Sequence, residues 1–139
     1  PQDRYIPRQE QGERQFSFWV NAGPVGSRMQ AIDREALARN EKPFALSFFP
    51  SGAGRKPKPG VTLSDKVVQV MAVKPAHKGG DLIVRLFEPT GRARETVLSL
   101  PFVPLRTKVQ LSRFEIKTLR INPRTKKVVE TDLLERPLS

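Results

Sequence analysis

The stretch from residue 81 to residue 100, DLIVRLFEPTGRARETVLSL, constrains the fold of this chain most strongly. Residues 82–87 form a nearly continuous apolar run, which is typical of a strand covered on both faces. The Pro-Thr-Gly sequence at 89–91 supplies turn chemistry, because its glycine can take a positive φ. Residues 95–100 are rich in Thr, Val and Leu and favour a returning strand. The stretch therefore predicts two strands joined by a tight turn.

Other segments also have the composition of strands. Residues 15–21, QFSFWVN, alternate between apolar and other side chains, so we expect a strand with one apolar face. Residues 114–121 change phase part-way, which predicts either a bulge near Lys117–Thr118 or a strand buried on both sides. Further short strands are expected at 44–49, 67–73, 109–111 and 128–134.

Residues 27–40 are the one good helix candidate. Ser27 can cap the N-terminus, and the apolar side chains of the segment fall close to one face. Asn40 can end the helix, because Pro43 cannot continue it. One helix and about eight short strands, with turn signals roughly every dozen residues, predict a mostly β fold. We expect an antiparallel β-sandwich, immunoglobulin-like or similar, with one short helix.

The length of 139 residues suggests one compact domain, or one domain with an appendage. The chain starts at Pro1 without an initiator Met, and we expect it to be a piece of a longer polypeptide. It has no cysteine, which excludes a disulfide framework and a thiolate metal site and fits a reducing compartment. No apolar run approaches the ~18 residues of a membrane span, so no membrane partner is expected.

The formal charge of +11 is concentrated in one part of the chain. Residues 106–127 hold eight basic residues against one acid. Such an excess can attract nucleic acid or an acidic partner. Nucleic-acid binding also calls for aromatics among the basic residues, but Phe114 is the one aromatic in this stretch. We therefore favour a solvated strand face with turns, expect no nucleic-acid partner, and keep a basic nucleic-acid-binding module as the less favoured alternative.

The sequence contains few residues that could act as catalytic or metal-binding groups. The single histidine, His77, lies in a PAHKGGD turn and cannot by itself build a metal site or a catalytic triad. Paired carboxylates for glycoside hydrolysis would have to come from acids such as Glu88, Glu95, Glu115 and Asp132. Each lies at a predicted strand end or on a polar face, so we expect these acids to be exposed or ion-paired. No catalytic and no metal-ligating residue is predicted.

Arg85 stands within the apolar run of its strand, where an unpaired charge would cost several kcal/mol. Glu88, three residues further on, projects from the opposite face of a regular strand. We therefore expect a carboxylate partner on another strand, such as Glu115 or Glu130. The alternative is that Arg85 contacts another domain or a ligand.

Five stretches, in order along the chain, carry a resemblance to a known family. They are YIPRQEQGERQFSFWVNAG (5–23), ARNEKPFALSFFP (38–50), DLIVRLFEPTGRARETVLSL (81–100), FEIKTLRI (114–121) and VVETDLLE (128–135). Together they resemble the C-terminal region of glycoside hydrolase family 38, the α-mannosidases, and its bacterial members in particular. Two positions depart from the family pattern, since Arg39 stands where an aromatic is usual and Arg113 replaces a usual proline.

The resemblance implies a large parent enzyme, a retaining α-mannosidase with an N-terminal catalytic domain, an aspartate nucleophile, a second acid and a zinc ion. No stretch here matches those catalytic and zinc residues. The resemblance therefore implies a non-catalytic C-terminal β-sandwich, without a cofactor of its own, that packs on and supports the catalytic domain of a parent hydrolysing terminal α-mannosides. Zinc is expected in the parent's catalytic domain, and a bacterial cytoplasmic location is expected.

The resemblance also divides the chain. It predicts the end of a preceding β-domain at 1–27, a helical connector at 28–43 and the C-terminal β-sandwich at 44–139. The expected partner is the catalytic domain of the parent chain. The candidates for an interdomain or substrate-cleft contact are Arg85, Arg55 and Lys56.

Separated from a preceding domain, the apolar strand at 15–21 would lack its neighbours and be prone to association. We expect it to dock on the sandwich or to pair with another copy, which would make a homo-oligomer. An alternative function is a stand-alone carbohydrate-binding or protein-interaction sandwich. Exposed coplanar aromatics would favour that function, and Trp19 and Tyr5 are the two candidates for it.

Overall fold

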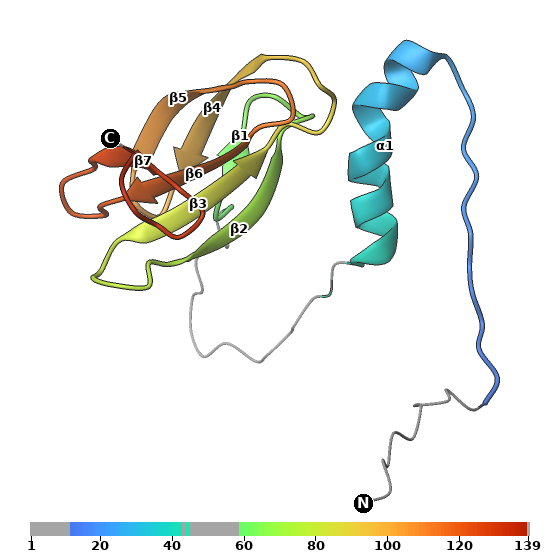
Figure 1. Cartoon of the computed structure of the whole chain (residues 1–139), viewed down its shortest axis with the longest axis horizontal. Coiled ribbons are helices and arrows are strands. Elements are labelled where there is room, and N and C mark those ends of the chain that lie inside the picture. The colour runs from blue at the N-terminus through green and yellow to red at the C-terminus, as the bar shows by residue number, and fades with distance from the viewer. Residues whose placement is uncertain (1–11, 43, 45–58, 139) are drawn as a thin grey trace, which may run out of the picture.

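The computed structural model describes residues 12–42, 44 and 59–138 (Figure 1). Two antiparallel sheets form a β-sandwich, with one helix beside it, which confirms the predicted fold class. The smaller sheet has the order β1-β4-β5 and the larger has the order β2-β3-β6-β7. The elements are α1 (Val25–Asn40), β1 (Thr62–Leu63), β2 (Gln69–Pro75), β3 (Leu82–Phe87), β4 (Arg94–Leu100), β5 (Leu105–Leu111), β6 (Ile116–Ile121) and β7 (Val128–Thr131).

The core lies between the two sheets and follows from the two-residue period of the strands. In β4, the buried residues Thr96, Leu98 and Leu100 alternate with the more exposed Glu95, Val97 and Ser99. The other strands contribute their inward side chains in the same way. The buried cluster consists of Val68, Val84, Leu86, Leu98, Leu100, Val103, Val109, Leu111, Leu119 and Ile121.

The central strand pair agrees closely with the prediction. Strands β3 and β4 occupy residues 82–87 and 94–100, and Gly91 in the turn between them has a φ of +72°. The two strands belong to different sheets, however, so this turn joins the two layers of the sandwich. Several other strands differ from the prediction in extent: β5 begins at Leu105, earlier than expected, and β7 ends at Thr131, before a turn. The predicted strand at 44–49 lies outside the described residues, except for position 44.

The phase change in residues 114–121 has a different origin from a bulge. Strand β6 pairs with β3 in a continuous register, and the shift in this sheet lies in β2, between Val70 and Ala72. Neighbouring residues Thr118 and Leu119 of β6 are both buried, because this strand is covered on both faces. Of the two predicted explanations, the strand buried on both sides is therefore the correct one.

The prediction of a strand at 15–21 was wrong within the described part of the chain. These residues run beside α1 (Figure 1), where the Asn21 amide donates a 3.0 Å hydrogen bond to Glu35 and the Arg39 guanidinium lies 5.6 Å from the centre of the Trp19 ring. Alternation produces a strand only when a neighbouring strand supplies hydrogen-bond partners. Here a helix is the neighbour, so the segment is extended but unpaired.

The helix begins two residues earlier than predicted. Its N-cap is Pro24, and the Ser27 hydroxyl donates a 2.9 Å hydrogen bond to the Pro24 carbonyl instead of capping a backbone N–H. The helix ends at Asn40, as expected. None of its side chains is buried, and its contact with the sandwich includes a 3.5 Å hydrogen bond from Arg34 to the Lys66 carbonyl.

The segment after β7 crosses the outer face of the larger sheet. The Glu135 carboxylate accepts a 2.6 Å hydrogen bond from the backbone N–H of His77 and is paired with Lys74 on β2. The chain then returns to the edge of β7 through a bridge between Thr131 and Pro137. This C-terminal segment therefore makes contacts from β7 to β2, the two edge strands of the larger sheet.

Candidate functional site

The densest cluster of polar contacts surrounds Glu88, at the end of β3. Pro89 follows it and has no N–H, and the next three backbone N–H groups all point back at the carboxylate. Thr90 N donates to Oε1 at 2.9 Å, and Gly91 N and Arg92 N donate to Oε2 at 2.7 and 3.1 Å. Successive N–H groups in a turn form an anion-binding nest, and here the anion is the chain's own side chain. Glu88 is consequently 0% exposed.

The same carboxylate also holds the connection between β5 and β6. Phe114 N donates to Glu88 Oε2 at 3.1 Å, and Phe114 has a φ of +55°. The Phe114 ring lies over Gly91, where an added Cβ would come within 2.5 Å of the ring. Glycine is therefore required at this position for two reasons, its positive φ and the close ring.

Arg94, at the start of β4, extends the cluster to a third connection. Its Nε donates to Glu88 Oε1 at 3.2 Å, and its Nη1 lies 3.1 Å from Asp65 Oδ2. Asp65 in turn accepts a 2.7 Å hydrogen bond from Val67 N, in the β1–β2 connection. One buried carboxylate and one arginine thus tie together the β1–β2, β3–β4 and β5–β6 connections at one end of the sandwich.

This environment keeps Glu88 ionised. Burial raises its pKa, but the hydrogen bonds from Thr90, Phe114 and Arg94 outweigh burial and lower the pKa from 4.5 to about 2. A carboxylate with this pKa and no exposed surface cannot act as a general acid near neutral pH. The cluster therefore holds three connections of the fold together, and its carboxylate does not serve as a general acid near neutral pH.

The depressed pKa predicts how stability depends on acid. A carboxyl group whose pKa is lower in the folded state stabilises the protein above its unfolded pKa, and this stabilisation is lost as pH falls through the folded value. For Glu88 the loss should occur between pH 4.5 and about 2, and the shift corresponds to about 3 kcal/mol. Urea unfolding at several pH values, compared between the wild type and Glu88→Gln, would measure this contribution. Parallel pH profiles for the two proteins would contradict it.

Arg85 has different partners from those predicted. Its Nε donates to Thr118 Oγ1 at 3.2 Å, and its Nη2 donates to the Leu133 carbonyl at 3.1 Å. The two expected carboxylates, Glu115 and Glu130, both pair with Lys117 instead, at 3.1 and 3.0 Å. The prediction of a carboxylate partner was wrong because Arg85 lies on the outer face of the sheet, under the C-terminal segment. Its contact with another domain stays a prediction, and Arg55 and Lys56 lie outside the described residues.

The other acids considered for catalysis are also engaged. Glu95 pairs with Lys108 at 3.3 Å and Asp132 pairs with Arg136 at 2.6 Å, so the expectation of ion-paired or exposed acids is confirmed for these residues. In the described residues, no three His, Cys, Asp or Glu side chains gather closely enough to hold a metal ion.

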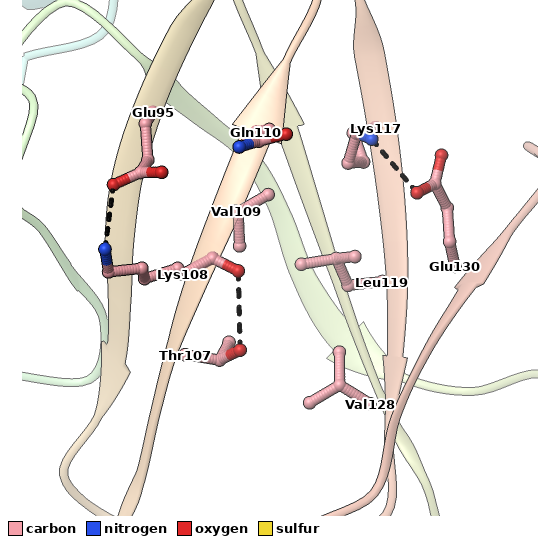
Figure 2. A pocket seen from close by; sticks show the side chains of 9 residues that line it. All are labelled: Glu95, Thr107, Lys108, Val109, Gln110, Lys117, Leu119, Val128 and Glu130. Atoms are coloured by element: carbon pink, nitrogen blue, oxygen red, sulfur yellow. Dashed lines mark hydrogen bonds and ion pairs between the residues drawn. The ribbon is translucent and has the colours of Figure 1, made fainter.

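A shallow hollow of about 340 Å³ opens along one side of the sandwich, between β5 and the strands β6 and β7 (Figure 2). Val109, Leu119 and Val128 form its apolar floor. Two ion pairs flank this floor in Figure 2, one between Glu95 and Lys108 and the other between Lys117 and Glu130. Burial lowers the pKa of Lys117, but the hydrogen bonds to Glu130 and Glu115 outweigh burial and raise the pKa above its ordinary value. Lys117 therefore stays charged.

The two aromatic candidates for a sugar-binding platform were Trp19 and Tyr5. Trp19 is half-exposed, and Arg39 lies against its ring. Tyr5, the other candidate, lies outside the described residues. The alternative of a carbohydrate-binding sandwich therefore gains no support from the geometry.

The comparison with protein families decides the identity of the fold. The model of the glycosyl hydrolases family 38 C-terminal beta sandwich domain matches residues 67–139. The chain belongs to this family. The match covers the strands β2 to β7, and it confirms the resemblance that the sequence motifs carry. No curated protein and no solved structure matches the chain. Among the described residues of this chain, no helix has both the length and the hydropathy needed to cross a membrane.

Sequence reasoning missed the Glu88 cluster and the side hollow. The signal for the cluster was present, since a Glu followed by Pro-Thr-Gly-Arg places several free N–H groups next to a carboxylate. The hollow has no local signal. It depends on which strand of one sheet lies across from which strand of the other.

Proposed function

We propose that this chain is the non-catalytic C-terminal β-sandwich of an α-mannosidase-like glycoside hydrolase, and that it packs on and supports the catalytic domain of that enzyme. The single observation that carries the proposal is the family match over residues 67–139. In this proposal the parent hydrolyses terminal α-mannosides, and its zinc ion is held by the catalytic domain.

The charge arrangement is consistent with a supporting role. The most buried carboxylate, Glu88, is saturated with hydrogen bonds and ionised at neutral pH, and Glu115 and Glu130 both neutralise Lys117. Groups used in this way stabilise the sandwich and are engaged with one another. In the proposal Arg85 remains a candidate for contact with the catalytic domain, because its guanidinium lies at the outer face of the larger sheet.

The test uses the natural reading frame that contains this chain. If the frame encodes an upstream catalytic domain, the whole enzyme and a version ending at residue 60 would be compared for hydrolysis of an aryl α-mannoside and for melting temperature. We expect the 139-residue chain alone to be inactive, the whole enzyme to be active with zinc, and the shortened enzyme to lose most of its activity and heat resistance. Hydrolysis by the 139-residue chain alone, or a shortened enzyme as stable and active as the whole one, would contradict the proposal.

A further inference from the structure

The two sheets of the sandwich are unequal, and the difference falls at β5. The smaller sheet has three strands and ends at β5, whereas the facing sheet has four strands and continues to β7. The hollow in Figure 2 lies along this side, where Val128 on β7 is only partly buried, whereas its neighbour Leu119 on β6 belongs to the buried core. A fourth strand beside β5 would fill this space.

The outer edge of β5 has backbone groups that could pair with such a strand. Val97 of β4 directs its backbone groups toward β1, because its carbonyl accepts from Ser64 N at 3.2 Å and its N–H donates to Ser64 Oγ at 2.8 Å. Its register partner on the other side is Lys108. In an antiparallel ladder, the backbone groups of Lys108 must then point away from β4, and those of Arg106 and Gln110 do the same. These groups have no backbone partner within the described residues.

The same chain contains a segment with the properties that this edge requires. Residues 15–21 are extended and unpaired, and they equal β5 in length. Phe16, Phe18 and Val20 are 73%, 87% and 96% exposed, although they share one face of an alternating segment. Placed beside β5, this face would cover the apolar floor of the hollow.

Charge favours this segment over a simple pairing of two β5 edges. Two β5 strands would bring Arg106 and Lys108 of one copy close to the same residues of the other, and like charges across a ladder are destabilising. Residues 15–21 carry no charged side chain. They can therefore pair with the basic edge without repulsion.

In the observed conformation the segment lies away from β5 of its own chain. Figure 1 places residues 12–23 on the far side of α1 from the sandwich. We propose that residues 15–21 of one copy pair with the free edge of β5 in a second copy. Reciprocal exchange would give a two-fold symmetric dimer, as in domain swapping. This pairing needs only the described residues of this chain.

Amide hydrogen exchange and mass together test the pairing on the full 139-residue chain. Within β5, the amides of residues 105, 107, 109 and 111 face β4, whereas those of Arg106, Lys108 and Gln110 face the open edge. We expect a dimer by sedimentation velocity, with slow exchange at all seven amides, and faster exchange at the three edge amides when dilution dissociates the dimer. A monomer at all concentrations, or fast exchange at the edge amides in the dimer, would overturn the proposal. Slow exchange of the edge amides in a monomer would also overturn the proposal, because a segment of the same chain would then cover the edge of β5.

Proline substitution provides a matched pair of variants. Lys108→Pro removes the outward N–H together with the charge, at a position where an edge strand tolerates proline, whereas Lys108→Gln removes the charge and keeps the N–H. We expect Lys108→Pro to weaken the dimer at least tenfold and Lys108→Gln to leave it intact. The double variant Ser17→Pro/Phe18→Pro lies in the donating segment, outside the sandwich, and removes two adjacent N–H groups that point to opposite edges of a strand. It should weaken the dimer even if Lys108→Pro fails to fold. Dimers of unchanged affinity in Ser17→Pro/Phe18→Pro would refute the pairing.

Discussion

Replacing Glu88 with Gln is expected to lower the free energy of unfolding by about 3 to 5 kcal/mol at pH 7. The substitution removes the negative charge and puts an NH2 group where a carboxylate oxygen now accepts backbone N–H groups. Arg94 would keep its contact with Asp65 but lose its buried partner. Urea unfolding, followed by circular dichroism, measures the change.

The control for this variant is Glu95→Gln. Glu95 pairs with Lys108, but both side chains are exposed, so this substitution should change stability by less than about 1 kcal/mol. If the two variants lose the same amount, the Glu88 cluster does not have the structural role assigned to it. An intact fold in Glu88→Gln, with fast exchange confined to the amides of residues 90–92 and 114, would show instead that the loss is local.

Truncating Leu98 to Ala is expected to cost about 2 to 5 kcal/mol. Leu98 is 0% exposed and belongs to the buried cluster between the sheets. The large cost follows because the two sheets cannot close around the cavity without disturbing strand pairing on both sides. Urea unfolding again provides the measurement.

Val97→Ala is the matched control, because Val97 directly precedes Leu98 in the same strand and faces the other way. Its cost should be clearly smaller than that of Leu98→Ala. Equal costs for the two substitutions would mean that the smaller sheet is covered on its outer face as fully as on its inner face, which would contradict the observed sandwich.

The failed predictions of a carboxylate partner for Arg85 and of a strand at residues 15–21 share one cause. The expectation for Arg85 used strand alternation correctly to exclude Glu88, but the choice among distant acids needed the order of the strands. The expectation for residues 15–21 used alternation to predict a strand, but alternation cannot supply a neighbour. In both cases the local pattern reports the two faces of a segment and says nothing about what lies opposite each face.

The sequence by itself determined the elements whose signals are local. The apolar run, the Pro-Thr-Gly turn and the returning strand predicted β3, β4 and the positive φ of Gly91, and the ordered motifs identified family 38. Only the tertiary structure decided that β3 and β4 lie in different sheets, that Glu88 is the anion in a nest of backbone N–H groups, and that the smaller sheet ends at β5. These features depend on contacts between residues far apart in the chain, and such contacts are fixed by how the two sheets pack and not by the period of any one strand.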